Sequence, residues 1–225
     1  MKALIFDSGS LISLSINGLL EELKKLKKIF NGEFIITKEV KKEVVDNPIK
    51  IKMYELEALK IQNLIDEGCL NMPNKIGIQD KEITNLMFKL MNLANTMFIG
   101  NGNEIKLIQQ GETSCLALSK ILNEKKIKNV LVIDERTLRI LVEAPENLKQ
   151  LLEKKLHTNI KLKKSNFQSF KNFKIIRSTE LMYLAYKKGL INLKGREVLD
   201  ALLYALKFKG CAISNDEIEE IKKIR

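Results

Sequence analysis

The sequence contains very little histidine, cysteine, proline or tryptophan. Its 225 residues include one histidine, three cysteines, three prolines and no tryptophan. Because His157 is the single histidine, we expect neither histidine-based acid–base catalysis nor a zinc site. The cysteines are odd in number and far apart, so we expect reduced, partly buried thiols rather than disulfides. If the chain is an enzyme, carboxylates must carry most of its chemistry.

The sequence also lacks long hydrophobic runs. It has no stretch of about 18 apolar residues, which a membrane-spanning helix requires, and its start does not resemble a signal peptide. We therefore expect a cytoplasmic protein with no membrane partner. The 39 lysines and arginines exceed the 28 acidic residues and give a formal charge of +11. This excess favours phosphate-rich partners such as RNA, although a lysine-rich composition alone can also produce it.

Two short apolar segments each run directly into an aspartate. Residues 3–6 precede Asp7, and residues 130–133 precede Asp134. Both segments are apolar at successive positions, as in strands that are buried on both faces. Because predicted helices alternate with short strands along the chain, we expect a three-layer α/β/α fold with a central parallel sheet. If the two strands are neighbours at a topological switch point, their aspartates lie close together.

The alternation of strands and helices is interrupted once. We interpret residues 144–175 as an insertion, formed by a helix and a hairpin or flap, within a single domain of residues 1–225. Further short strands are expected at 34–37, 70–72, 173–176 and 211–214, and a helix is expected at 80–99. The insertion contains interleaved basic and aromatic residues that would contact phosphates and stack on bases, namely Lys161, Lys163, Lys164, Phe167, Phe170, Lys171 and Lys174. An ordinary hairpin with its Phe residues packed inward is the alternative.

Further acids are placed where they could join Asp7 and Asp134. Glu112 begins a predicted helix, and Glu43 lies on the helix after the second strand. Adjacent carboxylates repel one another unless a cation offsets the repulsion, and hard oxygen ligands indicate Mg²⁺ or Mn²⁺ rather than zinc. Taken singly, each acid has an ordinary structural explanation. Either aspartate could be a helix N-cap, Glu112 could interact favourably with a helix dipole, and Glu43 could lie on a solvated helix face. The joint pattern favours a metal site.

The joint pattern resembles the PIN-domain nuclease family. The segment ALIFDSGSLI at 3–12 looks like the opening motif, TKEVKKE at 37–43 like the second, GETSCLAL at 111–118 like the third, and residues 130–136 like the fourth. The order and approximate spacing agree. Residues 178–191 also resemble the family's late helix and turn. The resemblance therefore covers most of the chain.

The resemblance implies a PIN-like fold and an endoribonuclease that hydrolyses single-stranded or structured RNA with bound Mg²⁺ or Mn²⁺. The family's metal ligands would correspond to Asp7, Glu43, Glu112 and Asp134, and Ser8 or Ser10 to its small hydroxyl residue near the metal. Glu135 stands where many members carry a further aspartate.

Several alternatives stay open. The sequence does not separate a toxin from a processing enzyme, so a homodimer, a protein antitoxin and an RNA-processing factor are all compatible partners. A non-catalytic RNA-binding protein with the same fold would also fit. A phosphohydrolase that uses Asp7 as its nucleophile is disfavoured, because such enzymes usually carry a second aspartate where this chain has Gly9.

Overall fold

A four-stranded parallel sheet forms the centre of the computed structural model, which describes residues 1–224 and all their side chains except those of 164–166. In spatial order the strands are β2 (Glu33–Ile35), β1 (Lys2–Phe6), β5 (Lys128–Val132) and β7 (Ile175–Ile176). β1 pairs in parallel with β2 on one side and with β5 on the other. The expectation that the two strands preceding Asp7 and Asp134 are neighbours is therefore confirmed.

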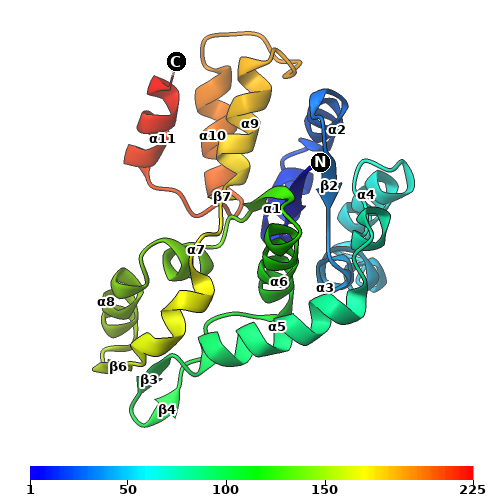
Figure 1. Cartoon of the computed structure of the whole chain (residues 1–225). Helices are drawn as coiled ribbons and strands as arrows, with labels where there is room; N and C mark the ends of the chain where they lie inside the picture. Colours follow the sequence, from blue (N-terminus) through cyan, green and yellow to red (C-terminus); the bar gives the residue numbers. More distant parts are fainter. Residues whose placement is uncertain (225) are drawn as a thin grey trace.

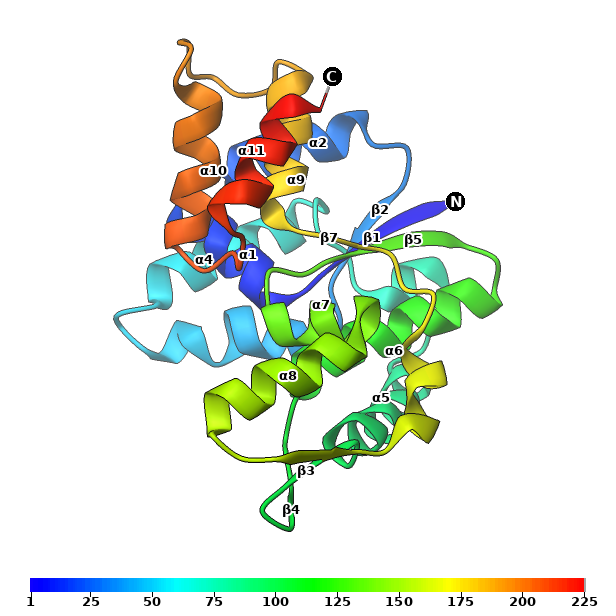
Figure 2. The ribbon, with the colours of Figure 1, turned by 90° about the vertical axis from the view of Figure 1, so that its left-hand side faces the viewer.

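Helices cover both faces of this sheet, which is consistent with a three-layer α/β/α fold. Figure 2 shows one layer above the sheet, formed by α2 (Leu20–Ile29), α9 (Ser178–Lys187), α10 (Val198–Phe208) and α11 (Asn215–Lys223). Below the sheet lie α5 (Asp80–Asn95) and α6 (Gln110–Glu124). The remaining helices of the first half of the chain are α1 (Ser8–Ile16), α3 (Lys38–Lys41) and α4 (Glu55–Asp66).

The hydrophobic core is continuous and includes the central strands. Residues 3–6 of β1 are at most 8% exposed, so the strand is buried on both faces as its uniformly apolar sequence predicts. The three cysteines are free and buried, which agrees with the expectation of reduced thiols. Within residues 1–224, no helix combines the length and the apolar character needed to cross a membrane.

A second, three-stranded sheet lies below the first and was not expected from the sequence (Figure 1). It is antiparallel, with the order β4 (Asn103–Glu104), β3 (Phe98–Gly100) and β6 (Ile160–Leu162). The predicted helix at 80–99 therefore ends earlier, at Asn95.

The predicted insertion is helical in part but contains no hairpin of its own. After α7 (Arg136–Glu143), α8 (Pro145–Leu156) forms as expected, and a 3₁₀ helix follows at Lys164–Phe170. The hairpin prediction is wrong because β6 pairs with β3, from a distant part of the chain, with Gly100 opposite Ile160.

Two further strand predictions are wrong. Near residues 70–72, only Asn71 forms a single bridge, to Ile35. Residues 211–214 form no strand, although the Ala212 N–H donates to the Asp134 carbonyl at 3.0 Å. Both segments are largely apolar, but each is so short that its sequence does not show whether another strand lies close enough to pair with it.

Candidate functional site

Asp7 lies directly after β1 and is buried, with 2% of its surface exposed. It occupies the N-cap position of α1, but its side chain makes no capping hydrogen bond. Its Oδ1 atom is buried and has no hydrogen-bond partner among the described residues. Burying a carboxylate oxygen without a partner is unfavourable, so the helix-cap alternative does not explain this side chain.

Ser10 fixes the end of β1 against the end of β5. Its Oγ atom lies 2.8 Å from the Asp7 carbonyl and 3.1 Å from the Val132 carbonyl, and can donate to either. The Asp7 N–H also donates to the Val132 carbonyl, at 3.1 Å. The Ser10 hydroxyl therefore holds backbone in place, and half-buried Ser8 is the hydroxyl residue left for a role near a metal.

Glu43 is brought to the site by an irregular turn of helix. After α3, the chain forms a π-helical turn at Lys42–Asp46, a distortion often found at functional sites. Glu43 Oε1 accepts a hydrogen bond from the Gly111 N–H at 3.2 Å. The Thr37 and Ser114 hydroxyls, 2.6 Å apart, tie the same two segments together. The second and third sequence motifs therefore lie side by side.

Glu112 lies in the first turn of α6, where its Oε2 accepts the Gln109 N–H at 3.1 Å. Burial raises its pKa to about 8, and repulsion from Asp7, Glu135 and Glu43 adds to the increase. Burial likewise raises the pKa of Asp7 to about 7, with repulsion from Glu43 and Asp134 added, although nearby backbone N–H groups act in the opposite direction. The acids predicted from sequence are thus close enough to repel one another.

Asp134 is held by a residue that the sequence did not identify. Both of its carboxylate oxygens accept hydrogen bonds from Ser178, at 2.7 Å from the N–H and 2.6 Å from the hydroxyl. Burial raises the Asp134 pKa, and the Ser178 contacts partly offset this. Asp134 is not a helix cap; Glu135 is, since its Oε2 accepts the Leu138 N–H at 2.7 Å. Glu135 therefore has a structural role beside the site.

Ser178 is itself kept in place by partly buried ion pairs at the start of α9. The preceding residue, Arg177, donates to Glu180 at 2.7 Å from Nε and to Glu217 at 2.6 Å. Burial opposes the charge on Arg177, but these two carboxylates outweigh it and raise its pKa. Residues 178–191 were singled out as a motif, yet no local pattern indicated that Ser178 would reach Asp134.

The acids fit a hard divalent cation in charge and in donor type. Asp7 offers a buried oxygen without a partner, and mutual repulsion would be offset by a positive ion. Within the part of the chain that the structure describes, however, no three acidic, histidine or cysteine side chains are already grouped closely enough to hold one ion. Asp7, Glu43 and Glu112 are the candidate ligands, while both oxygens of Asp134 are already hydrogen-bonded.

The predicted RNA-binding segment is only partly available. Phe170 is 1% exposed and belongs to the core, so the prediction that it stacks on a base is wrong. Phe167 is partly buried and packs against the same core. The exposed members of the segment are its lysines, Lys161, Lys163, Lys171 and Lys174. The side chain of Lys164 lies outside the described residues.

Replacing Gly111 by alanine is expected to displace Glu43 while leaving the fold intact. An added Cβ would lie 2.3 Å from Glu43 Oε2, which is the mobile end of a side chain and can move aside. Melting curves without metal should change little, and Mn²⁺ should raise the melting temperature of this variant less than that of the wild type if Glu43 holds a metal ion.

The control for this variant is Gly9→Ala, which places its Cβ 3.6 Å from Asp7 Oδ2, an ordinary contact. Equal stabilisation of the two variants by Mn²⁺ would contradict a role of the Glu43 position in holding metal.

No protein-family model matches the chain, and neither a curated protein nor a solved structure matches it. Its function has to be inferred from the side chains around Asp7.

Proposed function

We propose that the protein is an endoribonuclease with a PIN-like fold that uses Mg²⁺ or Mn²⁺ held by carboxylates. The observation that supports this most strongly is the approach of acids from three other segments, Glu43, Glu112 and Asp134, to Asp7, whose Oδ1 is buried without a partner. Such a cluster is unfavourable for folding, and perturbed carboxylates of this kind are typical of functional sites.

The residues of the site have distinct roles in this proposal. Asp7, Glu43 and Glu112 would hold the ion, and Asp134 would add negative charge and orient the start of α9. The N–H groups of Gly111 and Gln109 orient Glu43 and Glu112 respectively. A bound divalent ion lowers the pKa of a coordinated water and stabilises charge on phosphoryl oxygens. Because the pKa values of Asp7 and Glu112 are about 7 and about 8, these carboxyls should release protons when the ion binds.

His157 does not contribute to the chemistry in this proposal. It is exposed and lies in a left-handed conformation at the end of α8. Proton transfer therefore falls to the carboxylates and to water.

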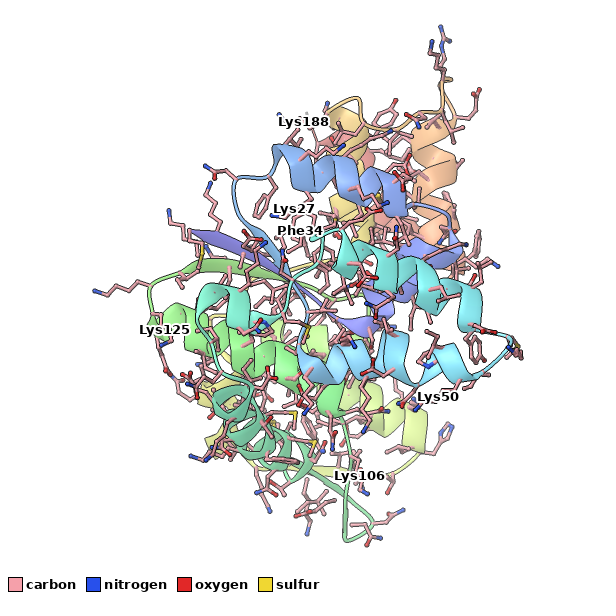
Figure 3. The ribbon with its side chains drawn as sticks, turned by 90° about the vertical axis from the view of Figure 1, so that its right-hand side faces the viewer. Lys27, Phe34, Lys50, Lys106, Lys125 and Lys188 are labelled. Atoms are coloured by element: carbon pink, nitrogen blue, oxygen red, sulfur yellow. The ribbon has the colours of Figure 1, made fainter. Side chains whose placement is uncertain are left out.

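RNA is the proposed substrate because the chain carries a formal charge of +11 and exposes many lysines. Figure 3 shows lysines on several elements of one side of the molecule, among them Lys50, Lys106 and Lys188. A cytoplasmic location fits an RNA substrate.

Cleavage of labelled RNA is expected in Mn²⁺ or Mg²⁺ and should stop when EDTA is added. Single-stranded and hairpin RNAs are incubated with folded protein and resolved on denaturing gels. Re-adding excess metal should restore cleavage. If folded protein cuts neither RNA in either metal, the nuclease proposal fails.

A non-catalytic RNA-binding protein is the second candidate. It is favoured by the hydrogen bonds that occupy both oxygens of Asp134 and by the absence of a preassembled group of three ligands among residues 1–224. In that case RNA binding would persist and weaken with salt, but Mn²⁺ would not raise the melting temperature. A metal-dependent rise in melting temperature would favour the enzyme.

A further inference from the structure

A hollow ringed by lysines lies at the amino ends of the central strands. Asp7 lies at the other end of these strands, after β1. The volume of the hollow is about 450 Å³, and it is lined at the amino ends of β1 and β5 and beside β7 by Lys2, Lys126, Lys128 and Lys174. In Figure 3 this end of the sheet lies near Lys125, the residue that follows α6. The hollow shares no residue with the carboxylate site.

The strand register forces these lysines together. Lys2 of β1 and Lys128 of β5 are direct partners in the parallel ladder. Leu131 is paired with Ile175, so the same register places Lys174 beside Val130 on the next strand. Like charges on directly opposed strand residues are destabilising. Two adjacent strands therefore begin with a lysine, and Lys174 directly precedes the third.

Within the described part of the chain, these four lysines lack a protein counter-charge. Among the described residues, no carboxylate lines the hollow, and none lies within ion-pair distance of Lys2, Lys126, Lys128 or Lys174. Nearby Lys27 is different, since it pairs with Glu33 at 3.1 Å and lies over the Phe34 ring. All four lysines of the hollow are exposed, so their charges are available to an anion from solution.

The inner wall of the hollow is partly apolar, and Asn123, Asn129 and Asn172 also line it. Leu4, Val130, Ile127 and Phe30 contribute to its apolar part. The Phe30 ring is fixed by packing against Phe34, with 5.4 Å between ring centroids. A cationic rim above an apolar wall matches a ligand with a phosphate at one end and a flat, weakly polar group at the other. The volume lies in the range of small-molecule sites, about 300–1,000 Å³.

We propose that this hollow binds a nucleoside phosphate. The lysines contact the phosphate oxygens, and the base packs against Phe30 and the apolar wall. The ligand is either a free nucleotide or one nucleotide unit of an RNA strand. The site does not depend on cleavage near Asp7, so it stands or falls separately from the nuclease proposal.

Binding is tested on the whole protein in EDTA, which excludes cleavage. ADP, a short single-stranded RNA and inorganic pyrophosphate, which matches the diphosphate of ADP, are each titrated by calorimetry. The test variant is Lys128→Glu; the control is Lys89→Glu, the same charge reversal at an exposed lysine of α5. Lys128→Glu should weaken binding of ADP or RNA about tenfold or more, as expected for loss of one charged phosphate contact, and Lys89→Glu should have little effect.

The pattern of ligands identifies the source. Binding of ADP indicates a free nucleotide, whereas binding of the RNA alone indicates a unit within a strand, and both support the site. Equal weakening by the two variants would show general electrostatics and overturn it. Pyrophosphate binding as tightly as ADP would also overturn it, since the nucleoside would then contribute nothing.

Discussion

Asp7→Asn should lower the rate of RNA cleavage about a hundredfold or more while making the metal-free protein more stable. Asparagine keeps the size and shape of the side chain but removes the charge that would bind the ion, so transition-state stabilisation is lost. The same change removes a buried charge that burial and the neighbouring acids disfavour, as the pKa of about 7 indicates. Activity and stability are thus expected to move in opposite directions. Cleavage rates in Mn²⁺ and urea-denaturation curves in EDTA measure the two effects.

Asp200→Asn is the matched control for this experiment. Asp200 forms a surface ion pair with Lys222 at 2.7 Å, on helices of the upper layer. Exposed pairs of this kind contribute little to stability, so this variant should cleave like the wild type. An Asp7→Asn protein with unchanged activity would remove Asp7 from the proposed mechanism. A protein that loses both activity and stability would show that Asp7 supports the fold instead.

The metal-free protein is expected to lose stability as the pH rises from about 4 to about 8. In the folded state burial, assisted by neighbouring acids, raises the pKa of Asp7 from 3.8 to about 7 and that of Glu112 from 4.5 to about 8. The folded protein therefore keeps protons that the unfolded chain has already released. The contribution of these two carboxyls to the free energy of unfolding is complete below about pH 4. It declines as the pH rises and is lost once the pH exceeds their pKa values in the folded protein. For Asp7, a pKa difference of about 3 corresponds to an upper limit on the order of 4 kcal/mol.

Comparison with Asp7→Asn isolates this effect from other titrating groups. Urea denaturation of both proteins at pH 5 and pH 8 in EDTA should show that the wild type loses a few kcal/mol relative to the variant at the higher pH. Adding Mn²⁺ at pH 8 should recover most of the loss in the wild type, because the cation offsets the repulsion among the acids. If the stabilities of the two proteins change equally with pH, the ionised form of the Asp7 carboxyl is not disfavoured in the folded state.

The sequence predicted the central sheet and the position of the acids well because both depend on strong local patterns. The apolar runs before Asp7 and Asp134 allow little except a buried strand, and parallel strands place their following residues at one edge. Glu43 and Glu112 stood out by their places on predicted helices, and the Gly111 contact then explains why a glycine precedes Glu112.

Other features could not be read from sequence because they depend on which segments meet in space. Ser178 reaches Asp134 only once β7, which leads into α9, has paired with β5, and nothing in the local sequence pattern indicates this. The lysine-ringed hollow follows from strand register, which sets Lys2 against Lys128 although they are far apart in the chain. Short strands such as β3 and β6 carry too few residues for a reliable periodicity.

The small sheet formed by β3, β4 and β6 has a consequence for how the molecule opens. Its pairings involve two or three residues each, and β4 is exposed. Phe98 and Ile160 are its principal buried contributions to the core. A unit with so few buried contacts opens at a lower free energy than the central sheet. Its amides should exchange with solvent deuterium through local openings, while the amides of β1 and β5 should exchange only when the whole domain unfolds.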